Sequence, residues 1–244
     1  MRLDSEWDKY LSGEDFSSSH AFPIPAEHRR PLTRFEVGSA IAAGRAVLHV
    51  GCVDHMPLIE DKIAAGTWMH EVLSDAAGRC GGVDINADGI DHMRSMGYDD
   101  LHVGNVDAPE RELLESGWEV LFLGEMLEHT DDPIGFLASV RNAWAGSAES
   151  VVVTVPNAFS WSTLRPTLRS TEVINTDHRF WFTPYTAAKV AVRAGFKVDS
   201  IHLCESFPET HDVGVASRIR QRVLREVLSR RPIYQSSVVL ELLF

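Results

Sequence analysis

The sequence predicts an α/β fold with a doubly wound, mainly parallel sheet and helices on both faces. Two observations support this prediction. Short apolar runs of strand length alternate along the chain with longer segments of helical character, and this alternation is typical of parallel sheets with right-handed crossovers. Several of these runs also end in glycine, an acid or an amide. In open α/β sheets, ligands bind at the carboxyl ends of the strands.

The expected strands are apolar or β-branched runs bounded by glycine, proline or polar residues. They cover residues 46–50, 81–85, 101–103, 120–123, 150–155, 197–203 and 238–244. The expected helices cover residues 33–43, 58–65, 68–77, 89–96, 133–144, 184–194 and 213–228. Two of these helices have strong start signals, because a capping side chain precedes a first-turn proline at Asp132-Pro133 and at Thr183-Pro184.

The composition, with 44% hydrophobic and 24% charged residues over 244 positions, is that of one elaborated globular domain. No apolar run approaches the roughly 18 residues that span a bilayer, and the first residues form no apolar signal segment. The three cysteines show neither disulfide nor metal-ligand spacing, so we expect a reducing, cytoplasmic setting. The net charge of −12 (23 − 35) argues against nucleic acid as the main partner and is compatible with a small-molecule substrate.

The stretch from Trp118 to Pro133 is the centre of the predicted site. An apolar strand ends here at Gly124, and Glu125, Glu128 and His129 follow it. Because these three residues stand at positions i, i+3 and i+4, a single helical turn would place them on one face. Two carboxylates and an imidazole at the carboxyl end of a buried strand indicate a place for chemistry.

The other strand ends offer groups that suit a nucleotide-like ligand. The first strand ends in His49-Val50-Gly51-Cys52, where glycine allows close approach to the backbone. The second ends at Asp84-Ile85, and the acid is placed to accept from a ribose diol. The third is followed by Asn105 and Val106, an amide and a backbone N–H that could read an adenine edge. NAD and S-adenosylmethionine binders share the glycine and the acid, so this pair is compatible with both.

The complete series resembles the class I S-adenosylmethionine-dependent methyltransferases, in particular the branch with ubiquinone-type O-methyltransferases and enzymes of polysaccharide and natural-product clusters. The resemblance covers about residues 45–203, and the order and spacing of the motifs carry it. The matching segments are residues 47–52, Gly82-Val83-Asp84-Ile85, Gly104-Asn105-Val106-Asp107, residues 124–133, Val155-Pro156-Asn157, residues 177–184 and Arg193-Ala194-Gly195-Phe196.

The resemblance implies a Rossmann-like, seven-stranded sheet of order 3-2-1-4-5-7-6 with the last strand antiparallel. It implies one methyltransferase domain over residues 1–244, with an N-terminal cap or lid at 1–44 and a cofactor-binding half at 45–155. The substrate-side half would cover 156–244, with a lid at 157–182 and an inserted helix at 213–231. S-adenosylmethionine would contact the strand ends at His49, Gly51, Cys52, Asp84, Ile85, Asn105, Val106, Gly124 and Glu125.

The first loop departs from the family pattern. The family usually has acid-x-Gly-x-Gly-x-Gly here, whereas this chain has His49-Val50-Gly51-Cys52-Val53-Asp54. The loss could weaken contacts to the methionine end of the cofactor, or Asp54 could replace the missing acid. The distance from Gly51 to Asp84 is 33 residues (84 − 51), longer than the roughly 20 of a minimal dinucleotide unit, and an extra helical piece at 55–66 would absorb the difference.

Relatives with a Glu-x-x-Glu-His turn, among them small-RNA 2′-O-methyltransferases, use it to hold a divalent cation. Here Glu125, Glu128 and His129 match that turn, and His178 matches the further histidine of the RNA enzymes. Carboxylate oxygens and imidazoles suit a six-coordinate Mg²⁺ or Mn²⁺, which would lower the pKa of an acceptor hydroxyl. In the rival interpretation, Glu125 contacts the cofactor and His129 is a metal-free general base. Across the two interpretations, the expected catalytic residues are His129, Glu125 and His178.

We therefore expect S-adenosylmethionine-dependent O-methylation of a small molecule, such as a sugar or a secondary-metabolite intermediate. Three alternatives are open: an RNA 2′-O-methyltransferase, a catalytically silent binding protein, and a nucleotide oxidoreductase. The first is suggested by the Glu-Glu-His-His set and opposed by the net charge. The second is suggested by the glycine-poor loop. The third lacks its phosphate-cradling glycines. The acceptor, its oxygen or nitrogen chemistry and the oligomeric state stay open.

Overall fold

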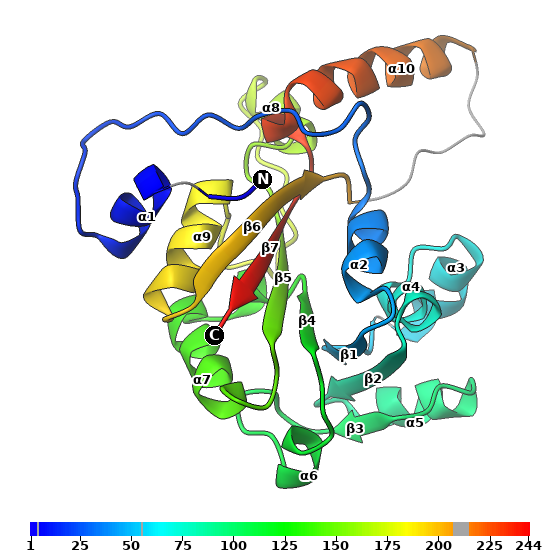
Figure 1. Cartoon of the computed structure of the whole chain (residues 1–244). Helices are drawn as coiled ribbons and strands as arrows, with labels where there is room; N and C mark the ends of the chain where they lie inside the picture. The colour runs from blue at the N-terminus through cyan, green and yellow to red at the C-terminus, as the bar shows by residue number, and fades with distance from the viewer. Residues whose placement is uncertain (4, 55, 207–214) are drawn as a thin grey trace.

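The computed structural model describes residues 1–3, 5–54, 56–206 and 215–244. Seven strands form one sheet in the order β3-β2-β1-β4-β5-β7-β6 (Figure 1). The strands β1 to β5 pair in parallel and β7 is antiparallel to both of its neighbours, which confirms the predicted sheet. The strands are β1 (Ala46–Val50), β2 (Arg79–Asp84), β3 (Leu101–Val103), β4 (Val120–Gly124), β5 (Ser150–Pro156), β6 (Lys197–Cys204) and β7 (Ser237–Leu243).

The helices lie mainly between the strands. They are α1 (Ser5–Ser12), α2 (Arg34–Ala42), α3 (Ile59–Ala64), α4 (Met69–Ala76), α5 (Ala87–Ser95), α6 (Arg111–Leu114), α7 (Pro133–Trp144), α8 (Trp161–Thr167), α9 (Pro184–Arg193) and α10 (Val215–Arg230). Short 3-10 turns are η1 (Met56–Leu58), η2 (Leu127–His129) and η3 (Pro232–Tyr234). The predicted capping residues Asp132 and Thr183 cap α7 and α9. The expected start of the inserted helix at residue 213 lies outside the described residues.

The sheet is buried on both faces. Alternate residues of β4 belong to two separate apolar clusters: Leu121 and Leu123 pack with residues of α7 and α9, whereas Val120 and Phe122 pack with residues of α2 and α4. Figure 1 shows these two helix pairs on opposite sides of the sheet. A strand that is apolar on both faces reads as a continuous hydrophobic run rather than an alternating one. This explains why Val120 to Leu123 could be recognised as a central strand.

The structure contains three helices that the sequence analysis does not predict, the four-residue α6 and two longer ones. The first 30 residues are expected to be irregular and outside the core, yet α1 forms there. Trp7 and Leu11, one helical turn apart, are only 5% and 0% exposed, and the Trp7 ring lies 6.1 Å from that of Tyr185 on α9. The second is α8, in a segment without clear periodicity, where Ser160 caps the helix. No helix in the described part of the chain is long and apolar enough to cross a membrane.

The topology brings several loops to the carboxyl ends of the parallel strands. β1 lies between β2 and β4, so the loops that follow these three strands are neighbours. The extra length between Gly51 and Asp84 forms η1 and α3, as expected for residues 55–66. In Figure 1, α8 and α10 lie beyond this end of the sheet, at the top of the view. The candidate site therefore has the strand ends as its floor and connecting segments as its walls.

Candidate functional site

A cavity of about 330 Å³ opens at the carboxyl ends of β1 and β4. It brings together eight of the twelve residues that the sequence predicts for the site: His49, Gly51, Cys52, Gly124, Glu125, Glu128, His129 and His178. Ten further residues complete the lining: Arg34, Val53, Asp54, Lys62, Thr67, Trp68, Met69, Met126, Thr154 and Asn175. The cavity is therefore built by the loops after two neighbouring strands, the first turns of α2 and α4, and the segment at 175–178.

Glu125 adopts a conformation that the sequence analysis does not foresee. Its φ of 53° lies in the left-handed region, which non-glycine residues adopt rarely. Its backbone N–H donates to the carbonyl of Thr154, 3.0 Å away, and its Oε1 accepts from the Thr154 hydroxyl at 3.0 Å. Arg34 Nη1 lies 3.5 Å from Oε2. Only Leu127–His129 forms a helical turn, of the 3-10 type, so the expected turn over all three polar residues is wrong.

Glu128 is the most unusual group in the cavity. Its side chain is 0% exposed, and neither carboxylate oxygen has a hydrogen-bond partner among the described residues. Burial, and secondly the nearby Glu125 carboxylate, raise the pKa of Glu128 to about 8. An unpaired buried carboxyl group is costly to the fold. Its presence therefore calls for a functional explanation, such as an ion.

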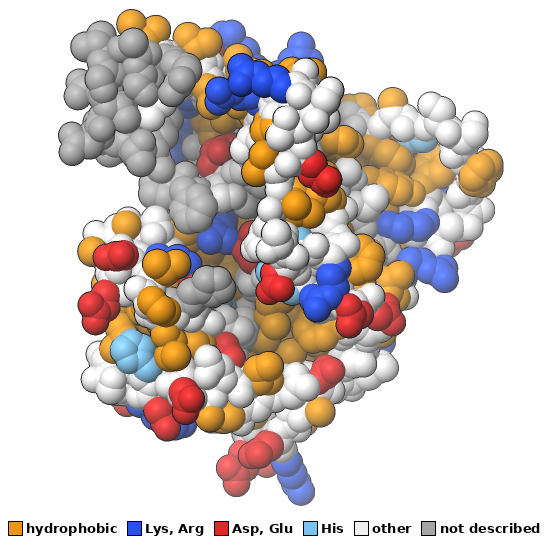
Figure 2. Space-filling view, turned by 180° about the vertical axis from the view of Figure 1, so that it is seen from behind, with side chains coloured by type: hydrophobic (Ala, Val, Ile, Leu, Met, Phe, Trp, Pro, Cys, Tyr) orange, Lys and Arg blue, Asp and Glu red, His pale blue; other side chains and the backbone are white. Residues whose placement is uncertain are grey.

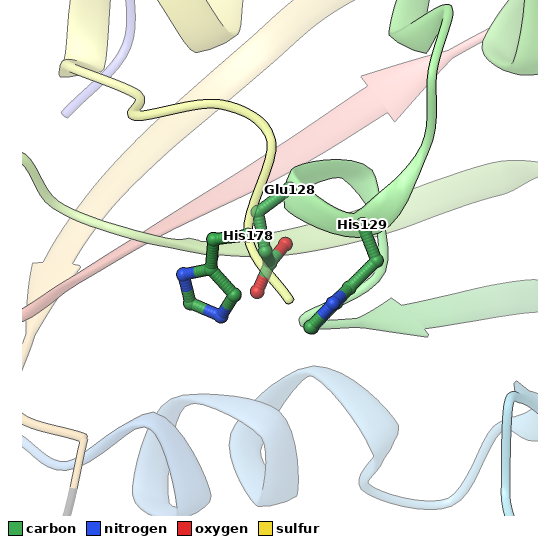
Figure 3. Close-up of side chains that lie close together, drawn as sticks. All are labelled: Glu128, His129 and His178. Atoms are coloured by element: carbon green, nitrogen blue, oxygen red, sulfur yellow. The ribbon is translucent and has the colours of Figure 1, made fainter. Parts of the chain in front are cut away.

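His129 and His178 converge on Glu128 from two separate segments (Figure 3). One ligand atom of each of these three residues lies within 4.8 Å of the others, and the two imidazole rings meet edge to face at 4.7 Å. Nδ1 of His178 is buried and has no hydrogen-bond partner in the described part of the chain. Burial, and secondly His129, lower the pKa of His178. Glu125 faces the same cavity but lies outside this three-residue cluster.

Arg179 ties the segment that carries His178 to the turn that carries Glu128 and His129. The Arg179 N–H donates to the Glu128 carbonyl at 2.7 Å, and its guanidinium donates to the His129 carbonyl. The guanidinium also lies 2.7 Å from Asp131 Oδ1. Nδ1 of His129 lies 3.9 Å from the largely exposed carboxylate of Asp177. These contacts fix the positions of the two segments that carry Glu128, His129 and His178, although 50 residues separate His129 from Arg179.

The four remaining predicted residues lie along the ends of β2 and β3 and do not line the cavity. The Asp84 carboxylate accepts the backbone N–H groups of Val53 and Asn86, each at 2.9 Å. Ile85, which follows it, is 76% exposed. Asn105 is exposed, whereas Val106 is buried. The ends of β2 and β3 therefore offer a carboxylate and an apolar surface beside the cavity rather than a closed pocket.

The back of the cavity holds residues that the sequence analysis does not assign to the site. Behind the cavity, His70 on α4 is buried, and its Nδ1 lies 3.3 Å from Nδ1 of His49. Arg34 and Thr154 position Glu125 but stand in no recognisable motif. Asp54 pairs with Lys62 at the cavity wall. Burial, and secondly the Asp84 charge, raise the pKa of the Cys52 thiol, so it is not an activated nucleophile.

The comparisons with known proteins bear on the fold. No protein-family model matches the chain, and no curated protein matches its sequence. Among solved structures, the chain is similar to the small RNA methyltransferase HEN1, with a TM-score of 0.55, 16% identity and 92% of this chain covered. It spans only 27% of the HEN1 chain.

Two further structures show the same similarity. A Mesorhizobium loti S-adenosylmethionine-dependent methyltransferase matches with a TM-score of 0.51 and 12% identity, over 86% of this chain and 95% of that one. A structure titled as a complex of the Haloferax volcanii Trm112 methyltransferase activator with a putative methyltransferase matches with a TM-score of 0.52 and 15% identity, over 88% and 85%. The fold is that of the S-adenosylmethionine-dependent methyltransferases. In this methyltransferase fold, the described cavity lies at the carboxyl ends of β1 and β4.

Proposed function

We propose that this protein transfers the methyl group of S-adenosylmethionine to a hydroxyl oxygen of a small acceptor molecule, with a divalent cation at Glu128, His129 and His178. One observation carries the proposal. A fully buried carboxyl group without a partner among the described residues stands beside two imidazoles, at the strand ends of a methyltransferase fold. Such a cluster is what an enzyme needs to activate a hydroxyl group.

The residues at the strand ends fit S-adenosylmethionine. Each oxygen of Asp84 accepts one backbone N–H, and each retains a lone pair for a ribose hydroxyl. The exposed Ile85 offers an apolar surface to the adenine, next to Asn105 and Val106. His49, Gly51, Cys52 and Gly124 would hold the methionine end, joined by Glu125 in the metal-free alternative. When bound, this cofactor supplies a sulfonium methyl group that a nucleophile can attack.

The cluster also fits a cation. Mg²⁺ and Mn²⁺ favour carboxylate oxygens, and Mn²⁺ also accepts imidazole nitrogens. Both Glu128 oxygens and Nδ1 of His178 are buried atoms without a protein partner in the described residues, so they are available as ligands. Glu125 lines the same cavity and is the fourth residue proposed to hold the cation. When bound, the cation would lower the pKa of the acceptor hydroxyl.

The protein's own groups supply positioning. Arg179 holds the backbone of Glu128 and His129, and Thr154 holds Glu125, so the cavity is built from restrained side chains. Effective positioning of two reactants lowers a barrier by several kcal/mol. In the metal-free alternative, His129 accepts the hydroxyl proton directly. Both versions predict methylation of an oxygen atom held next to His129.

A second candidate function is methylation of an RNA 2′-hydroxyl. The convergence of His178 on Glu128 and His129 favours it, because this histidine completes the ligand set that the sequence analysis associates with the RNA enzymes. The net charge of −12 opposes it, since phosphate backbones bind to positively charged surfaces. A salt-sensitive shift of a short RNA in a gel, lost on charge reversal of Arg222, would favour the RNA function over the small-molecule function.

The first experiment is mass spectrometry of small molecules that copurify with the protein, together with calorimetry of S-adenosylmethionine binding. We expect S-adenosylhomocysteine in the purified protein, or micromolar binding of the added cofactor. Absence of both would refute the methyltransferase proposal. Once an acceptor is known, EDTA should abolish turnover and Mn²⁺ should restore it. Full activity in EDTA would leave methyl transfer in place and remove the cation from it.

A further inference from the structure

A second hollow, of about 500 Å³, lies between α8 and α10 at the same end of the sheet. This volume is within the range of small-molecule binding sites. Neither the fold nor the proposed chemistry assigns a role to it. The side chains that matter for its chemistry are Trp161, Arg165, Arg169, Glu205, Tyr234 and Ser236.

The wall formed by α8 is positively charged within an acidic protein. The chain has 35 acidic and 23 basic residues, yet residues 157–171 contain no acid. Arg165 and Arg169 stand one helical turn apart, so they project from the same side of the segment. Both are exposed, and neither forms an ion pair or a side-chain hydrogen bond with any described residue. Figure 2 shows Lys and Arg side chains next to hydrophobic ones at the level of α8, in the upper part of that face.

Many other arginines of the described chain form ion pairs with carboxylates. Arg30, Arg79 and Arg179, for example, contact carboxylates at 2.5 to 2.7 Å. Two guanidinium groups left without a carboxylate, side by side at the mouth of a hollow, are therefore available to an anion. Guanidinium groups bind phosphate and carboxylate through paired, charge-assisted hydrogen bonds.

Aromatic side chains accompany these arginines. Trp161, the first residue of α8, is 40% exposed, and Tyr234 in η3 is half-buried. Both line the hollow with Arg165 and Arg169. Aromatic faces next to guanidinium groups bind flat rings by stacking. The combination selects a ring that carries a negative charge.

One acid, Glu205, also lines the hollow. Glu205 Oε2 accepts a hydrogen bond from the Ser236 hydroxyl at 3.1 Å, and Oε1 is buried without a partner among the described residues. Burial raises the pKa of Glu205. Among the charged residues that line the hollow, the two arginines outnumber this single acid.

The second hollow is connected to the first by short covalent and hydrogen-bonded links. Asn157, directly after β5, donates its N–H to the Ser236 carbonyl at 2.8 Å and its side-chain amide to the Gln235 carbonyl at 2.7 Å. Thr154, three residues earlier, holds Glu125 in the first cavity. Residues 157–182 supply α8 to the second hollow and His178 to the first.

We propose that the second hollow binds an aromatic ring bearing a phosphate or carboxylate group, with the anion on Arg165 and Arg169 and the ring against Trp161 and Tyr234. Its role as the subsite for the far end of the acceptor rests on the proposed function. The binding itself does not, so it can be measured without cofactor, cation or turnover.

The test is calorimetric titration of the full chain with four probes: phenyl phosphate, benzoate, phenol and inorganic phosphate. We expect phenyl phosphate or benzoate to bind at least tenfold more tightly than phenol and inorganic phosphate. The tighter of the two tells which anion the acceptor carries. The double variant Arg165→Gln/Arg169→Gln should lose at least tenfold in affinity, and Trp161→Leu should lose severalfold. Arg193→Gln, an exposed arginine on α9, is the matched control and should bind as the wild type does.

Equal affinity in the wild type and in the double arginine variant would overturn the proposal. So would inorganic phosphate binding as tightly as phenyl phosphate, because the ring would then add nothing. Circular dichroism and the thermal midpoint of each variant verify that it is folded. Cofactor binding by the same double variant separates the two hypotheses, because it should be unchanged when only the second hollow is lost.

Discussion

Nδ1 of His49 lies 3.3 Å from Nδ1 of His70, with both rings buried behind the candidate cavity. One of the two nitrogens must donate and the other accept, so this contact holds one proton. Burial lowers the pKa of His70 to about 4. Burial, the neighbouring His70 and Arg34 keep the pKa of His49 well below its ordinary value. His70 therefore constrains the tautomer that His49 presents to the cavity.

The free energy of unfolding should fall as the pH drops from about 6.5, the ordinary histidine pKa, to about 4, the pKa of folded His70. In this window the unfolded chain binds a proton at His70 and the folded chain does not, so protons favour unfolding. For His70 alone the loss is on the order of 3 kcal/mol. Urea unfolding followed by circular dichroism at several pH values measures it.

The variant His70→Phe keeps a buried ring but cannot be protonated, so its stability should depend less steeply on pH in the same window. His28→Gln, which removes an exposed histidine, is the control and should keep the wild-type dependence. If the wild type and His70→Phe show the same slope, the two buried rings are not a neutral pair.

The sheet could be predicted from the sequence because its signals are local. Apolar runs such as Val120 to Leu123 identify central strands wherever their neighbours lie. Helix α1 could not be predicted in this way. Its apolar face includes Trp7 and Leu11, and this face packs partly against α9, more than 170 positions later in the chain.

The residues of the candidate site also fall into two groups, those that the sequence could predict and those that it could not. Residues at strand ends, such as Gly51 and Glu128, could be identified because a parallel sheet collects them at one edge. Arg34, which lines the cavity from α2, and His70, which contacts His49 from α4, could not, because only the packing of these helices places them there. The conformation of Glu125 could not be predicted from the sequence either, because Thr154 on the neighbouring strand fixes it.

Substitution of Glu128 by glutamine should lower the affinity for Mn²⁺ at least 100-fold. The change keeps the size of the side chain and removes the carboxyl group that would bind the cation as a carboxylate, and loss of groups that merely support metal ligands already costs 10- to 100-fold. Calorimetric titration of the purified protein with Mn²⁺ measures the affinity directly. Glu112→Gln, at an exposed position on α6, should bind Mn²⁺ as the wild type does. Unchanged binding in the Glu128 variant would remove this residue from the proposed cation site.

Substitution of Asp84 by asparagine should weaken S-adenosylmethionine binding by more than tenfold, or roughly 1.4 kcal/mol. The carboxylate would lose its charge-assisted contacts with ribose hydroxyls. It would also lose one of its two backbone N–H partners, Val53 or Asn86, so the free energy of unfolding should fall by about 1 kcal/mol. Asp88→Asn, an exposed acid in the first turn of α5, is the control for both. A variant that is destabilised but binds the cofactor normally would assign Asp84 to the loop alone.

Substitution of Gly89 by alanine tests whether the glycine-poor loop after β1 is fixed by packing. An added Cβ would lie 2.2 Å from Cγ1 of Val53, a separation that backbone or side chain must relieve. Overpacking of this kind costs about 1–3 kcal/mol, which should exceed the gain of about 1 kcal/mol from better helix propensity. Gly89→Ala should therefore lower the free energy of unfolding, as measured by urea denaturation.

The double variant Val53→Ala/Gly89→Ala should recover most of that loss, because the smaller side chain frees the space that the new Cβ needs. The resulting coupling energy in a double-mutant cycle should be about 1 kcal/mol or more, as found for residues in direct contact. Gly104→Ala is the control, since its added Cβ would meet only Val83 at an ordinary 3.9 Å. Additive effects of the two substitutions would mean that Val53 moves freely, and the loop would then be open to a ligand in the absence of any cofactor.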